Sequence, residues 1–180
     1  MTQTPDTPFL FLCRRRRSVR KYRPEALQPE QAEQLLQAAL LAPSSKGRKA
    51  VEYIVVDEPE TLARLADVKP RFGRMIAGAA LAVVVCGRMD QSDVWIEDAS
   101  VAATTLLYAA ADLGLGACWV QLRERQTALG EPASAAVKQL LAIPPEAEPL
   151  CVVAVGLPEA QPQPHDTEAL PWEHVHIGKY

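Results

Sequence analysis

The segment of the chain with the clearest chemical potential is Arg14–Arg23, RRRRSVRKYR, in which seven of ten residues are basic. Guanidinium groups pair with phosphate through parallel hydrogen bonds, so Arg16, Arg17 and Arg20 around the hydroxyl of Ser18 are suited to hold a phosphate monoester. A solvated helix end or a nucleic-acid contact would also explain a basic run. The chain as a whole has a net charge of −3, from 19 basic and 22 acidic residues. Since no comparable second patch accompanies the segment, we expect no nucleic-acid partner.

A second polar segment is Ala42–Lys49, APSSKGRK, which follows an expected helix. Pro43 ends that helix, and Ser44, Ser45 and Gly47 come next, with three basic residues close by. Such a loop presents backbone N–H groups and hydroxyls to the polar edge of a ligand. An ordinary surface loop is the alternative interpretation.

The glycine pair in Leu113–Gln121, LGLGACWVQ, superficially suggests a dinucleotide-binding fingerprint. Trp119 stands where that fingerprint needs its third glycine, and the segment follows a helix and precedes a strand, which is the reverse of the required order. The simpler interpretation is that Gly114 and Gly116 make a tight turn from helix to strand.

Neither a nucleophile–base pair nor a metal site is predicted. His174 and His176 have no carboxylate or thiol cluster beside them, and no G-x-S-x-G segment is present. The four cysteines are far apart and three of them lie in apolar stretches, which is typical of reduced residues in a cytoplasmic protein. They are Cys13, Cys86, Cys118 and Cys151.

Hydrophobic periodicity predicts the elements that must position these residues. The expected helices are Pro8–Arg17, Glu30–Ala42, Pro59–Asp67, Val94–Leu113 and Pro132–Ala142, with Arg71–Ala79 as a further candidate, and the expected strands are Val51–Val56, Leu81–Cys86, Ala117–Val120 and Leu150–Gly156. These elements alternate but do not form a regular βαβ series, which predicts a mixed central sheet flanked by helices on both faces. A length of 180 residues fits one domain, residues 1–180, whose last part from about residue 157 is a Pro-rich extended tail.

The expected helix Val94–Leu113 is apolar around most of its circumference, which in a small chain indicates that a second subunit covers one side. The longest uncharged apolar runs, Met75–Gly87 and Ala99–Ala111, are shorter than the roughly 18–20 residues of a membrane span. The N-terminus has no basic region before its apolar residues, so it does not resemble a signal peptide. We therefore expect a cytoplasmic protein without a membrane partner.

Three segments together resemble the nitroreductase family of FMN-dependent oxidoreductases. Arg16–Tyr22, RRSVRKY, is similar to the family's opening R-R-S-[VI]-R-x-[FY] motif. Ala42–Ser45, APSS, resembles its loop after the second helix, and Ala109–Trp119, AAADLGLGACW, resembles its A-A-x-x-L-G-L-G-[SA]-C-W segment. The resemblance covers nearly the whole chain. It implies an α+β, nitroreductase-like fold and a homodimer with FMN in two clefts between the subunits and a C-terminal tail that reaches the partner.

The resemblance also implies roles for individual residues. The N-terminal arginines and serine match positions that hold the FMN phosphate and the pyrimidine edge, the serine loop matches a partner-chain loop over the flavin, and the segment after the glycine pair passes flavin N5. The expected cofactor-binding residues are Arg16, Arg17, Ser18, Arg20, Pro43, Ser44, Ser45, Lys46, Gly47, Trp119, Val120, Gln121, Leu122 and Lys179. Because FMN carries the hydride chemistry, no catalytic side chain is expected.

The chain departs from the family pattern at two places. Gly47 stands where many relatives have an asparagine, so a side-chain contact to the flavin is lost. Many relatives also have a Lys/Arg pair near the C-terminus, whereas the matching stretch here is Leu170–His174 and only Lys179 is basic. The N-terminal arginines are therefore expected to carry more of the phosphate charge.

The function that these observations imply is transfer of a hydride from NAD(P)H, through flavin N5, to a nitroaromatic, quinone or similar electron-poor small molecule by a ping-pong mechanism. One alternative is an FMN-dependent dehydrogenase or reductive dehalogenase for one specific metabolite. Another is a non-catalytic flavin-binding dimer, or a basic-patch protein without flavin.

Overall fold

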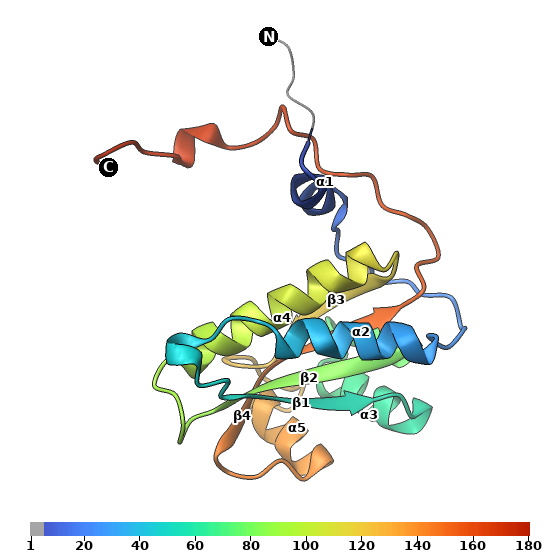
Figure 1. Cartoon of the computed structure of the whole chain (residues 1–180). Coiled ribbons are helices and arrows are strands. Elements are labelled where there is room, and N and C mark those ends of the chain that lie inside the picture. The colour runs from blue at the N-terminus through green and yellow to red at the C-terminus, as the bar shows by residue number, and fades with distance from the viewer. Residues whose placement is uncertain (1–5) are drawn as a thin grey trace.

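The computed structural model describes residues 6–180, so the first five residues of the N-terminus, where we expect no signal peptide, lie outside the described part. Four strands form one sheet in the order β1-β2-β4-β3 (Figure 1). The strands are β1 (Val51–Val56), β2 (Leu81–Arg88), β3 (Gly116–Gln121) and β4 (Ala147–Gly156). The α-helices are α1 (Pro8–Arg15), α2 (Pro29–Leu40), α3 (Pro59–Val68), α4 (Trp95–Asp112) and α5 (Ala133–Leu141), and short 3-10 helices cover Ser45–Gly47, Arg74–Gly78 and Trp172–His174.

Helices cover both faces of the sheet, as the sequence predicts. The central strands β2 and β4 are buried along nearly their whole length, which explains their continuous apolar runs. On one face Val84 and Val152 pack with residues of α3 and α5. On the other face Val83 and Val153 pack with residues of α2 and α4. The result is one sheet between two apolar cores.

The expected mixed sheet needs a correction, because every pair of neighbouring strands is antiparallel. The alternation of helices and strands suggested parallel crossovers. The link between β1 and β2, residues 57–80, contains both α3 and a 3-10 helix and returns the chain to the end of the sheet where β1 stopped. Helix α4 does make a crossover, because β2 and β3 run in the same direction, but β4 lies between them and pairs antiparallel with both. An isolated parallel bridge joins Ser18, outside the named strands, to Ala117 of β3.

Helix α4 is buried on one side only within a single chain. Ala99, Ala103 and Leu106 are fully buried against the sheet, whereas Val101 on the opposite side is 40% exposed. The expected burial around the whole helix is therefore not reached by one chain alone. The exposed side remains available to a second subunit.

The segment Arg16–Tyr22 is held against the end of the sheet by two close contacts. The Val19 side chain lies over Gly116, where an added Cβ would come 2.6 Å from Val19 Cγ1. The Tyr22 ring lies over Gly156, where an added Cβ would come 2.9 Å from the ring. The Tyr22 hydroxyl donates to the backbone oxygens of Val19 (2.7 Å) and Ala154 (3.2 Å).

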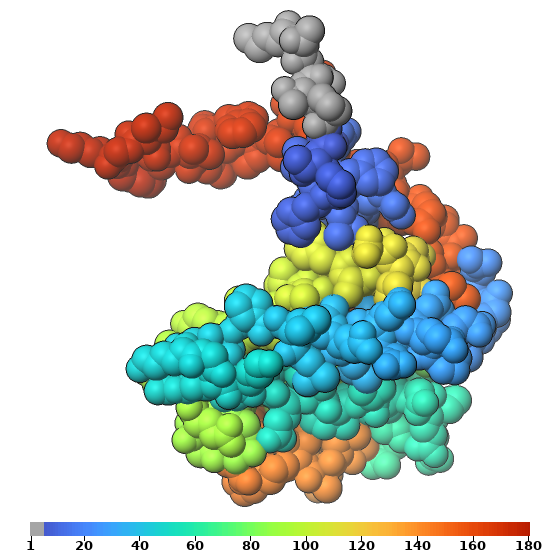
Figure 2. All heavy atoms as spheres, in the orientation of Figure 1, coloured from blue at the N-terminus to red at the C-terminus, as the bar shows by residue number. Residues whose placement is uncertain are grey.

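The tail expected from about residue 157 is extended and first runs beside the basic segment. The Arg23 N–H donates to the Leu157 oxygen (2.8 Å), and Arg17 Nη1 donates to the Gln163 oxygen (2.6 Å). Residues 166–180 then stand away from the body of the molecule (Figures 1 and 2). Between residues 6 and 180, no helix has both the length and the apolarity needed to cross a membrane.

We predict that Gly116→Ala destabilises the protein through the Val19 contact. The added methyl must displace a buried side chain, so the expected loss is about 1–3 kcal/mol in the free energy of unfolding, measured by urea denaturation. Gly78→Ala is the matched control, because an added Cβ there meets nothing within 4 Å. The loss caused by Gly116→Ala should be smaller in a protein that already carries Val19→Ala than in the wild type. An equal loss in both would show that the contact with Val19 is not its cause.

Candidate ligand-binding site

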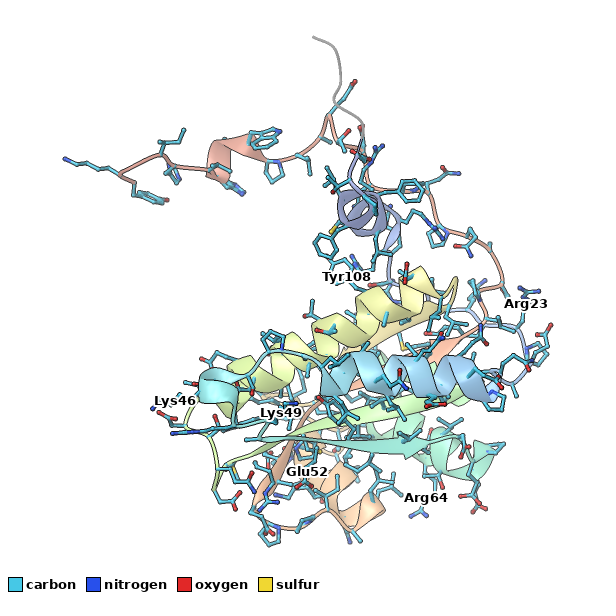
Figure 3. The ribbon with its side chains drawn as sticks, in the orientation of Figure 1. Arg23, Lys46, Lys49, Glu52, Arg64 and Tyr108 are labelled. Carbon is cyan, nitrogen blue, oxygen red and sulfur yellow. The ribbon has the colours of Figure 1, made fainter. Side chains whose placement is uncertain are left out.

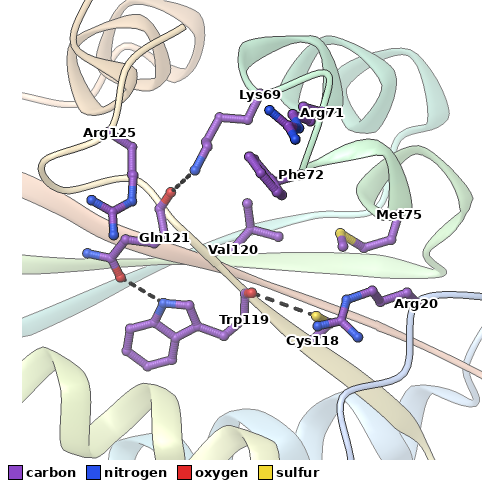
Figure 4. Close-up of a pocket in the computed structure, with 10 residues that line it drawn as sticks. All are labelled: Arg20, Lys69, Arg71, Phe72, Met75, Cys118, Trp119, Val120, Gln121 and Arg125. Atoms are coloured by element: carbon purple, nitrogen blue, oxygen red, sulfur yellow. Dashed lines mark hydrogen bonds between the residues drawn. The ribbon is translucent and has the colours of Figure 1, made fainter.

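A cavity of about 380 Å³ opens at the β3 edge of the sheet (Figure 4). β3 supplies its floor, the Ser18–Arg20 segment one end, and the loops after α3 and β3 the rest. The lining residues are Arg20, Lys69, Arg71, Phe72, Met75, Cys118, Trp119, Val120, Gln121 and Arg125.

Of the predicted residues of the N-terminal segment, Arg20 lines one end of this cavity, and Ser18 and Arg16 lie near Cys118, which also lines it. Burial raises the pKa of the Cys118 thiol above its usual range, and Arg20, Ser18 and Arg16 oppose that rise because they lie close enough to favour the thiolate. The Val19 N–H donates to the Ala117 oxygen (3.0 Å), which fixes this segment along β3. The structure therefore brings two cations and a hydroxyl to one place.

Arg17 contacts the tail. Its guanidinium donates to the Gln163 backbone oxygen, and Arg17, like Arg16 and Ser18, is not one of the residues that line the cavity. In one chain, Arg17 therefore ties the tail to the basic segment.

Three of the four predicted β3 residues line the cavity. Trp119 Nε1 donates to Gln121 Oε1 (2.8 Å), and Gln121 Nε2 donates to the Arg123 oxygen (3.1 Å), so both side chains are fixed. Val120 lies between them in the floor. Leu122, just after β3, instead lies in the α3/α5 core, where it is 2% exposed, and does not line the cavity.

Five lining residues lie outside the sequence motifs: Lys69, Arg71, Phe72, Met75 and Arg125. Lys69 Nζ donates to the Gln121 oxygen (2.9 Å). Burial, and secondarily the charge of Arg125, lower the pKa of Lys69 below its usual range. The only signal in the sequence was the short basic stretch that contains Lys69 and Arg71, which has no pattern of its own.

The cavity is strongly electropositive. Arg20, Lys69, Arg71 and Arg125 line it without a carboxylate among the other lining residues. Within residues 6–180, none of these four side chains forms a salt bridge. Unpaired cations around a partly apolar hollow attract an anionic ligand with a flat apolar part.

The predicted loop Pro43–Gly47 is anchored on the first turn of α4. The Ser45 N–H donates to Asp98 Oδ1 (2.7 Å), and the Ser92 hydroxyl donates to Asp98 Oδ2 (2.9 Å). Asp98 is 4% exposed, so it is a buried carboxylate with both oxygens satisfied.

The loop itself has an unusual backbone. Lys46 and Gly47 have φ values of +53° and +66°, in the left-handed region. The Ser44 hydroxyl accepts from the Lys49 N–H (2.8 Å), which closes the turn. Glycine tolerates this conformation at little cost, which gives a structural reason for Gly47 in place of an asparagine.

Within one chain, the loop does not reach the cavity. The loop contacts Asp98, whereas Arg16 lies near Tyr108, ten residues further along α4 or about 15 Å along its axis. Figure 3 shows Lys46 and Arg23 on opposite sides of the molecule. Lys179 is also remote, because it lies in the exposed end of the tail. In the part of the chain described, no group of three or more His, Cys, Asp or Glu side chains could hold a metal ion.

Comparison with known proteins assigns this architecture to a class. The sequence profile of the nitroreductase family matches residues 13–71 and 73–157. That match includes the basic segment, the serine loop and all four strands. The chain belongs to the nitroreductase family.

Similar proteins extend over most of the chain. An FMN-dependent nitroreductase from Clostridium difficile R20291 is 35% identical, with a TM-score of 0.91 over 94% of this chain and 98% of that structure. A structure from Parabacteroides distasonis is 31% identical, with a TM-score of 0.89 over 97% of this chain and all of its own. An Archaeoglobus fulgidus relative with the provisional name NADH dehydrogenase/NAD(P)H nitroreductase is 34% identical over 80% of this chain and 82% of its own.

We predict that Asp98→Ala releases the Pro43–Gly47 loop while Asp98→Asn retains it. The alanine removes both acceptors and leaves the Ser45 N–H and the Ser92 hydroxyl without them. Asparagine still offers an oxygen to Ser45 and can donate to the Ser92 oxygen. Hydrogen exchange of the Ser45 amide should become at least about tenfold faster in the alanine variant alone. Equal protection in both variants would show that Asp98 does not hold the loop.

Proposed function

We propose that the protein is an FMN-dependent oxidoreductase that uses NAD(P)H to reduce nitroaromatics, quinones or similar electron-poor small molecules. The observation that carries this proposal is the cavity at β3, which Arg20 lines at one end, with Ser18 and Arg16 close to the neighbouring Cys118 side chain. The membership of the family, and the 35% identity to a protein described as an FMN-dependent nitroreductase, support it.

The chemistry of the lining residues fits FMN. Its phosphate carries about two negative charges at neutral pH, and guanidinium and hydroxyl donors such as Arg16, Ser18 and Arg20 bind such a group strongly. The edge of the flavin ring would face the β3 segment Trp119–Gln121. When bound, FMN supplies the hydride chemistry at its N5 atom, so the protein has to bind, orient and electrostatically tune the ring. A cation at Arg20 favours negative charge on the pyrimidine side.

We propose a homodimer in which each site draws on both chains. The Pro43–Gly47 loop is well ordered but lies far from the cavity of its own chain, and the exposed side of α4 is free to pack against a partner. The tail, with Trp172 69% exposed, is proposed to dock on that partner. Lys46 and Lys179 would then come to the flavin of the other subunit.

Donor and acceptor are proposed to use the same open face of the cavity in turn, which gives ping-pong kinetics. The cavity lies at the exposed β3 edge of the sheet, so the acceptor site is expected to be permissive. We also propose that this single-domain protein works in the cytoplasm, where its four free thiols would stay reduced.

The first experiment is an absorption spectrum of the purified protein, after incubation with FMN, before and after anaerobic addition of NADH and then NADPH. We expect flavin bands that bleach with one of these donors. Bands that persist with both donors would contradict the proposed electron donor and favour a binding role. Failure to retain FMN at all would contradict the proposed cofactor. Intersecting rather than parallel double-reciprocal plots would contradict the ping-pong mechanism.

We predict that Arg16→Ala combined with Arg20→Ala weakens FMN binding by at least about tenfold, because each lost charge-assisted hydrogen bond contributes about 1.5–3 kcal/mol. The measurement is the dissociation constant from flavin fluorescence quenching. Arg64→Ala is the matched control, since Arg64 is an exposed arginine on α3 that does not line the cavity. Equal FMN affinity in the double variant and the wild type would refute the phosphate assignment.

A further inference from the structure

The outer part of the cavity contains charges that the proposed cofactor site does not use. Arg71 and Arg125 lie on separate loops, after α3 and after β3, and both are exposed at the cavity. Figure 4 shows Arg125 on the opposite side of the cavity from Arg20, where the FMN phosphate residues gather. Arg125 Nη1 donates to the backbone oxygen of its neighbour Glu124 (2.9 Å), and the other donors of its guanidinium, with Arg71, can bind a second ligand.

We propose that Arg71 and Arg125, with the ring of Phe72, form a subsite for an anionic group on a co-substrate, either the carboxylate of an aromatic acceptor or the 2′-phosphate of NADPH. The proposal rests on the proposed function, because it concerns the molecules that exchange a hydride there.

The geometry of Phe72 carries the first part of this argument. Its ring is 60% exposed and lines the cavity. The Arg71 guanidinium lies 5.2 Å from the ring centroid, and Lys69 Nζ lies 5.7 Å from it. Phe72 thus offers an apolar surface with a guanidinium beside it, which matches a flat molecule that carries an anion at its edge.

The charge balance carries the second part. Between residues 6 and 180, neither Arg71 nor Arg125 has a carboxylate partner. Lys69 Nζ already donates to the backbone oxygen of Gln121 (2.9 Å), and the pKa of Lys69 is lowered by burial and by the nearby Arg125 charge. A bound anion would reduce this repulsion between cations, so its binding to the cavity is electrostatically favourable.

The side chains of Trp119 and Gln121 help to define the position of the subsite. They are fixed by their mutual hydrogen bond, and the backbone oxygen of Gln121 accepts from Lys69 Nζ. The β3 segment therefore fixes both the floor of the cavity and the ammonium group of Lys69 near Arg125. A co-substrate in contact with this floor would place its anion within reach of the arginines.

The kinetic test compares 4-nitrobenzoate with its neutral methyl ester as acceptors, and NADPH with NADH as donors, in the wild type and in Arg71→Gln/Arg125→Gln. Rates are normalised to bound flavin. We expect either the acid/ester ratio or the NADPH/NADH ratio of kcat/KM to fall at least about tenfold in the variant. A fall in the first ratio assigns the subsite to the acceptor, and a fall in the second assigns it to the donor. If both ratios stay within about twofold, the proposal is overturned.

Two further measurements separate this proposal from the proposed function. Arg64→Gln removes one exposed arginine outside the cavity and should leave both ratios unchanged. Calorimetric titration with benzoate, and with NADP⁺ against NAD⁺, reports anion binding without turnover and is done with and without FMN. Loss of benzoate or NADP⁺ binding in the double variant would support the subsite even if the protein proved inactive toward nitro compounds and quinones. Equal binding of both ligands to variant and wild type would overturn it.

Discussion

The close packing of Val19 on Gly116 and of Tyr22 on Gly156 is the contact on which the site depends. Because Gly116 and Gly156 have no side chains, the N-terminal segment can lie directly on the end of the sheet. The Tyr22 hydroxyl then ties that segment to β4. Arg16, Ser18 and Arg20 owe their place beside the cavity to this contact, because no regular element carries them there. The close packing on the two glycines thus positions the cationic residues.

The cavity that results concentrates positive charge at a cost. Cations held close together without counter-ions destabilise the protein, and the pKa of Lys69 is lowered first by burial and then by the nearby Arg125 charge. Proteins retain such arrangements where a ligand supplies the missing charge. The phosphate of the proposed cofactor would supply it at the Arg20 end. Arg71 and Arg125, at the opposite end, also have no counter-ion among residues 6–180. This is the physical reason to expect an anion on a co-substrate.

The sequence predicted those helices and strands whose residues form a local hydrophobic pattern. β2 and β4 were evident as apolar runs, and α4 as a long helix, because burial on both faces of a sheet leaves a continuous signal. The antiparallel topology was not evident, since the alternation of helices and strands does not show that β4, the last strand in the chain, lies between β2 and β3. Gly114 does make the expected turn, with a φ of +72°. Gly116 has a different role, visible only once Val19 is seen above it.

The site itself was predictable only in part, for a similar reason. Arg20 and Trp119–Gln121 belong to recognisable motifs and do line the cavity, whereas Lys69, Phe72 and Arg125 reach it from loops whose sequences have no pattern. The chain also divides its predicted cofactor residues between the two ends of α4, with the Asp98-anchored loop at one end. A two-fold axis through the exposed side of α4, near Val101, would bring each loop toward the partner's cavity. A symmetric dimer with shared sites would explain why one chain carries these residues at two separate places. In a monomer, the loop that Asp98 anchors would not contribute to a cavity.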